Sequence, residues 1–480
     1  MDTATRAAAA ANVLASLTNP PSALISPHRP SPTLSFAAKR NHTTTTLCST
    51  KPNIGSTNNN NNSNTNENPT LEPHSPPPIS SQFSTNPSNP SSPISSLSTT
   101  GLVFDLGAEQ SSWDCREIGR PVVKRFVSDD EERWYMWYYG SSSVDGGRDS
   151  IGIAASSNGI HWERGRGAVR SSGDAGMVMS CSKDWWAFDV ESIRPSEVVV
   201  MSSAKVRSST AVYWLYYTGY SSEKVVVCEA HKALISNPDR GSVGGEDYGC
   251  VLRSLPGLAI SQDGRHWARI EGEHHSGALF DVGSKSNKEW DSLFVASPQV
   301  VFHTSGDLRM YYHSFDEQTG LFSIGIARSR DGIRWVKLGK IDFVGSPSSR
   351  EGCFDEFGGL NANVVRKGKD GEYVMAYEGV GVNGERSIGL AVSSDGLGDW
   401  RRYGEGPVLK PDQCSSDGDR WDGCGVGSPC LVQMDGQPND EWRLYYRGVG
   451  KGGRSGIGMA VSVCEGGEIG SFQRWTGFHL

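Results

Sequence analysis

A short phrase recurs five times along this chain, and a fixed repeat restricts the fold more than any other feature of a sequence. Each copy combines an aliphatic strand around a Gly, a polar turn and, in four copies, a closing Trp. The copies are IGIAASSNGIHW (151–162), PGLAISQDGRHW (256–267), IGIARSRDGIRW (324–335), IGLAVSSDGLGDW (388–400) and a degraded IGMAVSVCEGG (457–467), which Trp475 follows. The chain therefore contains five related units.

Two further elements precede every copy of the phrase. An aromatic run comes directly upstream, as WYMWYYG (134–140), YWLYYTG (213–219), RMYYHS (309–314), YVMAYEG (373–379) and RLYYRG (443–448). Upstream again, Trp or Phe followed by Asp leads after a short gap into an apolar strand, in segments 113–123, 188–199, 290–301, 354–365 and 421–432. Each unit thus supplies three short strands, and a fourth after the Trp.

The turns of the units indicate antiparallel hairpins. Four copies of the phrase place Asn-Gly or Asp-Gly in the turn, and these residues tolerate the positive φ that a tight hairpin needs. The segments show no helical period. Four antiparallel strands repeated five times predict an all-β fold, a five-bladed β-propeller of four-stranded antiparallel blades.

The ends of the repeat region predict how the ring closes. GLVFDLGAEQSSWD (101–114) resembles GALFDVGSKSNKEWD (277–291), where the stretch before Trp-Asp is the outermost strand of the preceding blade. The last unit stops before such a strand, so the N-terminal strand at 102–106 should join the last blade and remove an open edge. The second unit departs most, with roughly 26 extra residues between Gly219 and Leu258 that we expect in a surface loop over one rim.

Residues 1–100, called the leader below, differ from the repeat region in composition. They are rich in Ser, Thr, Asn, Ala and Pro and contain none of the 14 Trp. Such a segment offers little apolar surface, so we expect 1–100 to be disordered and 101–480 to form the propeller. Asp2 is the only acid in the first fifty positions, which is typical of a transit peptide. We predict the chloroplast stroma, with the mitochondrion as second choice; the alternative is an ordinary low-complexity tail.

Charge and composition exclude several classes of function. The leader holds five of the 46 basic and three of the 54 acidic residues, so 101–480 carries about −10 without a basic run. A nucleic-acid partner is therefore not expected. No apolar stretch approaches the roughly 20 residues that span a bilayer, so we expect a soluble protein. The ten Cys form no CxxC pair, which fits neither a zinc site nor a disulfide scaffold. We predict no metal and no cofactor.

The propeller predicts which side chains share a central pocket. In each blade the first strand starts at one rim and the second strand returns to it. The first-strand starts are Arg120, Arg194, Ser297, Asn361 and Ser428, and the second-strand ends are Tyr139, Thr218, His313, Glu378 and Arg447. These positions differ between blades where their neighbours repeat, which suggests an asymmetric ligand; the alternative is that they fill the channel with water and cross-channel hydrogen bonds. The predicted substrate-binding residues are Arg120, Arg194, His313, Asn361, Arg447 and Tyr139.

The Asp that follows each Trp or Phe is a candidate catalytic group. It recurs in every unit, as Asp114, Asp189, Asp291, Asp355 and Asp422. Recurrence favours a structural role in which each Asp accepts backbone N–H bonds between blades, because one active site does not need five copies. The alternative is that one or two of them, aided by Glu117, Glu191 or Glu356, form a catalytic pair.

Glu378 stands apart because its equivalent positions hold Tyr, Thr, His or Arg. A carboxylate at the pocket could act as a general acid if its pKa were raised. The alternative is an ion pair with Arg447.

With these elements placed, residues 101–480 resemble the arabinanase/levansucrase/invertase superfamily, the five-bladed propellers of glycoside hydrolase families 43, 32 and 68. The resemblance rests on the Trp-Asp segments, the aromatic runs and the IGxAxSxDGxxW phrase. It implies a trio of carboxylates at or near the first-strand starts of the first three blades. The matching positions are Arg120-Pro121, Arg194-Pro195-Ser196-Glu197 and Ala296-Ser297-Pro298, and none presents the expected acid in place.

Substitutes for that trio are available nearby. They are Asp114 or Asp189 as nucleophile or base, Glu191 as stabiliser and Glu378 as acid. One predicted function is therefore a glycoside hydrolase-like protein that acts on or binds a carbohydrate, with a two-carboxylate mechanism. The other is a catalytically inactive propeller that binds an anionic sugar or a protein partner, since Arg120, Arg194 and Arg447 would suit phosphate or carboxylate oxygens.

Overall fold

The structure, a computed structural model, describes only part of the chain. It covers residues 100–127, 131–143, 146–201, 212–227, 231–235, 249–344, 352–368, 371–412, 420–434, 441–465 and 468–477. The leader lies outside the described residues apart from Thr100, so the predictions of disorder and targeting stay predictions.

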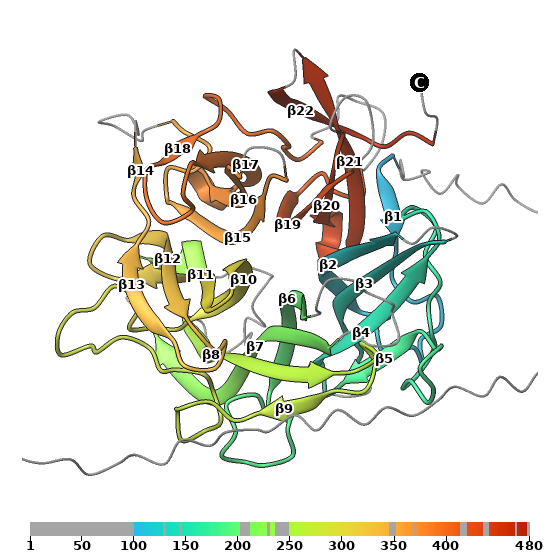
Figure 1. Ribbon diagram of the computed structural model, residues 1–480, viewed down its shortest axis with the longest axis horizontal. Helices are drawn as coiled ribbons and strands as arrows, with labels where there is room; N and C mark the ends of the chain where they lie inside the picture. The colour runs from blue at the N-terminus through green and yellow to red at the C-terminus, as the bar shows by residue number, and fades with distance from the viewer. Residues whose placement is uncertain are drawn as a thin grey trace, which may run out of the picture. The chain divides into compact units, whose positions relative to one another are not determined.

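Five sheets follow one another along the chain around a common axis, with the first strand of each innermost (Figure 1). Blade 1 contains β2 (Glu117–Val127), β3 (Glu132–Ser141), β4 (Asp149–Ser156) and β5 (Gly176–Met179). Blade 2 contains β6 (Ser192–Met201), β7 (Val212–Val226), β8 (Cys250–Ser261) and β9 (Ala268–Ile270). Blade 3 contains β10 (Ala296–Thr304), β11 (Asp307–Asp316), β12 (Leu321–Ser329) and β13 (Val336–Lys340).

The last two blades carry additions. Blade 4 contains β15 (Gly359–Arg366), β16 (Tyr373–Val380), β17 (Arg386–Ser393) and β18 (Trp400–Arg402), and β14 (Phe343–Val344) adds to β18 in parallel. Blade 5 contains β19 (Gly425–Gln433), β20 (Trp442–Val449), β21 (Ser455–Glu465) and β22 (Glu468–Arg474). The turns between second and third strands hold η2 (Val382–Gly384) and η3 (Lys451–Gly453). The predicted five-bladed β-propeller is confirmed.

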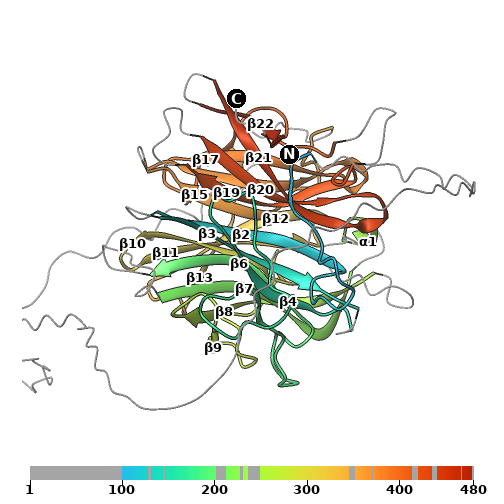
Figure 2. The same cartoon turned by 90° about the vertical axis from the view of Figure 1, so that its right-hand side faces the viewer.

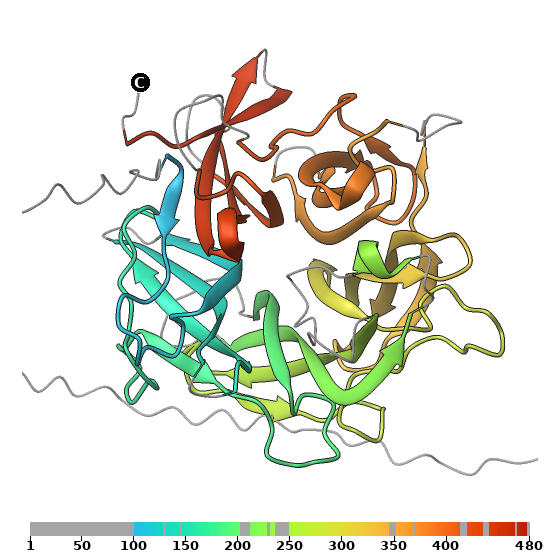
Figure 3. The same cartoon turned by 180° about the vertical axis from the view of Figure 1, so that it is seen from behind.

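The ring is shut by its own N-terminal strand, β1 (Leu102–Phe104). It pairs antiparallel with β21, with Leu102 opposite Gly458, and Gly101 N–H donates to Trp475 O at 2.9 Å. Figures 1 and 3 show β1 in blue beside the red strands of blade 5. The predicted closure is confirmed, with one difference: blade 5 also forms its own β22, so β1 and β22 share the outer edge of β21.

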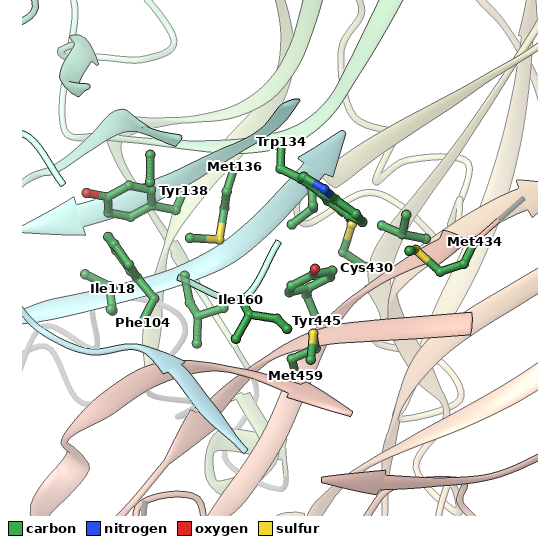
Figure 4. Close-up of a cluster of buried hydrophobic side chains, with 14 of the residues drawn as sticks. Phe104, Ile118, Trp134, Met136, Tyr138, Ile160, Cys430, Met434, Tyr445 and Met459 are labelled. Carbon is green, nitrogen blue, oxygen red and sulfur yellow. Dashed lines mark hydrogen bonds between the residues drawn. The ribbon is translucent and has the colours of Figure 1, made fainter. Parts of the chain in front are cut away.

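The core between neighbouring blades is apolar and rich in aromatic residues. Figure 4 shows this packing where blade 5 meets blade 1: Trp134 and Met136 of β3 face Tyr445 and Met459, and Phe104 of β1 completes the cluster. All five are buried. Burying each such side chain stabilises the fold by about 1.5–3 kcal/mol, so this seam supports the closure.

Close packing explains why the recurring phrase contains Gly. The Trp or Phe before each Asp lies across the third strand, and its ring centroid is 5.3–5.9 Å from that of the second-strand Tyr. A Cβ on the third-strand Gly would overlap that ring. The pairs are Gly152–Trp113, Gly257–Phe188, Gly325–Trp290, Gly389–Phe354 and Gly458–Trp421.

The Asp that follows each Trp or Phe joins the interblade link to the second strand and to the segment after the third strand of its blade. Its Oδ2 accepts a hydrogen bond from the second-strand Tyr hydroxyl at 2.8–3.1 Å and faces a cation near the closing Trp at 2.7–3.4 Å. We call these sets the Asp latches. They are Asp114–Tyr138–Arg164, Asp189–Tyr217–Arg269, Asp291–Tyr312–Lys337, Asp355–Tyr377–Arg402 and Asp422–Tyr446–Arg474.

The latches correct one prediction. We expected backbone N–H groups as partners of these Asp residues, whereas the structure gives side chains. Burial, with the neighbouring carboxylate, raises the pKa of all five Tyr hydroxyls, so they remain protonated donors.

The turn of the phrase also binds the preceding blade. An aromatic residue two positions before the second-strand end donates to the carbonyl of the turn Gly in the next blade, at 2.6–3.1 Å. The pairs are Trp137–Gly264, Tyr216–Gly332, Tyr311–Gly396 and Tyr445–Gly159. Blade 4 has Ala376 at this position, and the fifth copy of the phrase lacks the Asp-Gly turn. Between blade 4 and blade 5, the aromatic donor and the Asp-Gly turn that would accept from it are therefore both missing from the sequence.

The insertion of blade 2 is not simply the surface loop that we predicted. Its first and last parts lengthen β7 and β8, which stay paired as far as Val226 and Cys250. The short helix α1 (Lys232–Ile235) contacts η2 of blade 4, and Figure 2 shows it at one side of the molecule. Ile235 is buried with Phe315 and Val380. The insertion thus spans blade 3 and reaches blade 4 at the rim where the second strands end.

Removing the carboxylate of a latch should destabilise the fold strongly. In Asp355→Ala, the buried Tyr377 hydroxyl and Arg402 guanidinium lose their shared partner, so we expect a loss of about 3–5 kcal/mol in the free energy of unfolding. Chemical denaturation measures it. The exposed Asp342→Ala is the matched control and should stay within about 0.5 kcal/mol of the parent. Equal losses in both variants would contradict a structural role for the latch.

Candidate functional site

Four of the predicted first-strand positions share an unusual backbone conformation. Arg120, Ser297, Asn361 and Ser428 have φ of 51°, 60°, 51° and 47°. Each lies at a β-bulge, where the first strand carries an extra residue against the second. A left-handed conformation costs a residue other than Gly about 1–2 kcal/mol. All four residues line one axial pocket. Four blades therefore carry this conformational cost at the equivalent position of the first strand.

The axial pocket lies between the first strands of the blades. Its polar lining consists of Arg120, Ser196, Ser297, Asn361, Asn363 and Ser428, and the remaining lining residues are Pro, Val and Ala. Its cavity volume is about 30 Å³. Small-molecule sites span roughly 300–1,000 Å³, so only a small group at the end of a larger ligand fits inside this pocket.

Arg120 connects the walls of the pocket. Its guanidinium donates to Ser297 Oγ and Asn361 Oδ1, and to Ser196 Oγ at 3.3 Å. Ser297 Oγ also donates to Asn361 Oδ1 at 2.7 Å. Arg120 and Asn361 both line this pocket, and their role in substrate binding stays a prediction. The cross-channel hydrogen bonds that we considered as the alternative to a ligand are present as well.

Arg194 does not occupy the position that we predicted for it. It pairs with Thr218 across the sheet, as Gly119 pairs with Tyr139, so the residue equivalent to Arg120 is Pro195. A proline ring holds φ near −65° and excludes the left-handed conformation. Arg194 instead turns towards blade 1.

There, Arg194 Nε donates to Asp149 Oδ2 at 2.6 Å, and the guanidinium lies 4.3 Å from the ring centroid of Tyr139. Arg194 is therefore absent from the lining of the axial pocket, to which blade 2 contributes Pro195 and Ser196.

The second-strand ends have a structural task that explains much of their variation. Three of them accept the backbone N–H that the left-handed residue of the next blade presents. Thr218 Oγ1 accepts from Ser297 at 2.9 Å, His313 Nδ1 from Asn361 at 3.4 Å and Glu378 Oε2 from Ser428 at 2.9 Å. These contacts satisfy buried donors that would otherwise cost about 1–3 kcal/mol each.

The two remaining second-strand ends face a different neighbour. In the blade that follows Tyr139, the equivalent position is Pro195, which has no N–H to donate. The Tyr139 hydroxyl donates to Glu117 Oε1 at 2.7 Å. The side chain of Arg447 has no acceptor atom for a backbone N–H of the next blade. It pairs with the same Glu117 Oε1 at 2.9 Å. Tyr139, His313 and Arg447 thus surround the pocket without lining it.

Glu378 is buried, with 1% of its surface exposed, one residue behind the pocket wall. Besides Ser428 N–H, its carboxylate accepts from Asn361 Nδ2 at 2.8 Å and pairs with Arg386 Nη1 at 3.2 Å. Arg386 is a cation beside Glu378 that we did not predict; the alternative of an ion pair with Arg447 stays a prediction. The assignment of Glu378 as general acid stays a prediction.

The other predicted catalytic residues lie outside the axial pocket. Asp114 and Asp189 belong to the Asp latches of blades 1 and 2 through their Oδ2 atoms. Glu191 pairs with Arg148 at 3.6 Å on the rim between these blades. The structure therefore does not gather Asp114, Asp189, Glu191 and Glu378 in one cavity, and their catalytic roles stay predictions.

Several polar residues of the site were missed or left in a minor role. Arg386 could have been found from strand register, since Arg386 pairs opposite Val380 and shares a face with Glu378. Glu117 opens β2 and was considered only as a helper of Asp114. Burial raises the pKa of Asp149, while the Arg194 guanidinium opposes the shift, and no sequence pattern indicated this pair. Among the described residues, no cluster of three or more His, Cys, Asp or Glu could hold a metal ion, and no helix is long and apolar enough to span a bilayer.

Comparison with known proteins finds distant similarity to solved structures. No protein-family model and no curated protein matches the chain. Among solved structures, a glycoside hydrolase is 18% identical with a TM-score of 0.49, covering 78% of this chain and 95% of its own. A thermostable family-43 glycoside hydrolase is 18% identical with a TM-score of 0.47 (74% and 92% covered). An N-acetylgalactosamine deacetylase from F. plautii, in complex with blood group B trisaccharide, is 13% identical with a TM-score of 0.48 (75% and 94%). One fold hosts different chemistries, so function has to be inferred from this chain's own residues.

Ser428 should behave as a residue kept for function at the expense of stability. In Ser428→Gly the left-handed conformation no longer costs about 1–2 kcal/mol, but the greater chain entropy of glycine in the unfolded state costs about 0.5–1 kcal/mol. We therefore expect a net gain of roughly 0.5–1 kcal/mol in the free energy of unfolding. Denaturant unfolding measures it. Ser428→Ala removes the unpartnered hydroxyl but keeps the backbone cost, so Ser428→Gly should exceed Ser428→Ala in stability by that roughly 0.5–1 kcal/mol. A stability loss in Ser428→Gly would refute strain at this position.

Proposed function

We propose that this protein binds a carbohydrate that carries a negative charge, a sugar acid or a sugar phosphate, with the charged group in the axial pocket. The observation that carries the proposal is the polar lining of that pocket. It combines one guanidinium, three serine residues and two asparagine residues, and it contains no carboxylate. A cationic pocket without acids favours an anion.

The chemistry of the lining fits both parts of such a ligand. The guanidinium of Arg120 presents a planar fork that matches the oxygens of a carboxylate or phosphate. Serine hydroxyls and asparagine amides both donate and accept, as the hydroxyls of a sugar require. Among the described residues, none hydrogen-bonds the buried Oγ of Ser428. An unsatisfied buried hydroxyl costs about 1–3 kcal/mol, and a bound sugar would satisfy it.

Glycoside hydrolysis is the second candidate, favoured by one observation. Glu378 is hydrogen-bonded to Asn361, a lining residue, so a carboxylate lies directly behind the pocket wall. A two-carboxylate mechanism needs two such groups about 5 Å apart for retention or about 6.5–9.5 Å apart for inversion. The lining contains neither, because Arg120, Pro195 and Ser297 stand where the resemblance implies acids. We therefore favour binding over hydrolysis.

Binding should depend on the charge of the ligand and on Arg120. By isothermal titration, we expect the full chain to bind galacturonic acid or glucose 6-phosphate at least about tenfold more tightly than glucose, because a charge-assisted bidentate hydrogen bond is worth about 1.5–3 kcal/mol. Arg120→Ala should abolish this preference, and Arg120→Lys should restore only part of it. Equal affinity for glucose, or an unchanged preference in Arg120→Ala, would contradict the proposal.

Turnover separates the two candidates. We expect the full chain to release no product from a panel of aryl glycosides and plant oligosaccharides while it still binds acidic sugars. If hydrolysis does occur, the second candidate requires that Glu378→Gln lower kcat by about 100-fold or more, as loss of a general acid does. Turnover that survives in Glu378→Gln would reject Glu378 as the acid.

The leader provides a further proposal, that the protein acts in a plastid. Its support is the composition of residues 1–100, rich in Ser and Thr and nearly free of acids at its start. A fluorescent protein fused behind residues 1–100 should accumulate in chloroplasts of transformed leaf cells. A fusion of the same length in which Arg6, Arg29, Lys39 and Arg40 are changed to Glu should stay in the cytosol. Cytosolic fluorescence of the unchanged fusion would refute the proposal.

A further inference from the structure

Two adjacent tryptophans project into solvent from a well-ordered part of the propeller. Trp185 is 87% exposed and Trp186 is 46% exposed. Among the described residues, Phe302 is the other large aromatic side chain with comparable exposure, at 46%. A Trp side chain carries some 150–250 Å² of mostly apolar surface. Exposed aromatic surface of this size marks interaction sites rather than ordinary surface.

The exposure does not come from a loose loop. Ala187 N–H donates to Asp184 O at 2.9 Å, and Ser182 N–H donates to Asp189 O at 3.0 Å. Beyond Ala187, Phe188 and Asp189 are buried and belong to the packing and the Asp latch of blade 2. The backbone that carries the indoles is therefore held on both sides, so little conformational entropy would be lost on binding.

The loop lies at the same end of the strands as the axial pocket. It connects the end of β5, Met179, with the start of β6, Ser192. Pro195 and Ser196, near the start of β6, line the pocket. The loop thus crosses the rim from the outermost strand of blade 1 to the innermost strand of blade 2, a span of roughly 15 Å at about 4.8 Å per strand. Phe302, by contrast, lies near the other end of its strand β10.

The surroundings of the indoles indicate a polar ligand. Lys183 and Asp184, adjacent in sequence, are exposed, and Glu191 at the end of the same loop pairs with Arg148 at 3.6 Å. An apolar protein surface would bury these charges at a cost, whereas a sugar chain can stack its C–H faces on the indoles and keep its hydroxyls in water.

We propose that Trp185 and Trp186 form a stacking subsite for a chain of acidic sugars, whose terminal charged group enters the axial pocket. The inference rests on the proposed function and extends it from a single acidic sugar to an oligomer. The pocket, with a cavity volume of about 30 Å³, admits only that small group, so the sugar units themselves lie outside it, and the indoles stand on the same rim. The subsite makes affinity depend on chain length.

The test is a series of oligogalacturonides of one to six units, titrated into the full chain. We expect the hexamer to bind about tenfold or more tightly than galacturonic acid, as two stacking contacts would give. The double variant Trp185→Ala/Trp186→Ala should keep the affinity for the monomer and lose the gain with length. Phe302→Ala, at the other end of the strands, is the matched control and should keep the gain. Unchanged melting temperatures show that the variants remain folded.

The outcomes separate this inference from the proposed function. Affinity that does not rise with length, or a rise that survives in the double variant, overturns the stacking subsite and leaves the axial pocket standing. A hexamer that binds through the tryptophans while galacturonic acid fails to bind overturns the axial pocket and retains the subsite. Failure of every oligomer to bind overturns both.

Discussion

Four residues other than glycine, held in the left-handed region, govern the geometry of the axis. Each turns its backbone N–H towards the preceding blade, where Thr218, His313 or Glu378 accepts it in three of the four cases. The acceptor and the bulge therefore depend on each other across a blade boundary. Without the acceptors the bulges would leave buried donors unsatisfied, and without the bulges Arg120 and Asn361 would not face the pocket. Such strain is retained where it serves a site.

The axial layer also depends on a rigid ring around it. Within each blade the Asp latch joins the interblade link, the second strand and the segment after the third strand, and between blades an aromatic side chain binds the next turn. β1 supplies the last connection, because it ties the first residues of the propeller to β21. Five first strands can converge on one pocket only if this circle is complete. The repeated residues thus maintain the ring, and the residues that differ between blades shape the pocket.

Much of the fold could be predicted because the repeat displays its own period. The blade count, the strand order and the closing strand at 102–106 needed only alignment of the units. Arg194 was misplaced because Arg194-Pro195 looks like Arg120-Pro121 in sequence, and only strand register shows that the two are offset by one residue. Arg386 was missed as a partner of Glu378 because contacts between side chains follow from strand register rather than from order along the chain.

Other features were beyond sequence reasoning because burial is a property of the folded chain. No pattern distinguishes Trp185 and Trp186 from the buried aromatic residues of the Trp-Asp and Tyr-Tyr motifs, yet their exposure makes them candidates for ligand contact. Likewise, Ser428 resembles Ser297 in sequence, but only the structure shows that its hydroxyl has no partner among the described residues. The most direct test of an anion site at the axis is a crystal structure of the chain with galacturonic acid. We expect the carboxylate on the guanidinium of Arg120 and a sugar hydroxyl on Ser428 Oγ; a carboxylate bound elsewhere, with Arg120 still bonded to Ser297 and Asn361, would contradict it.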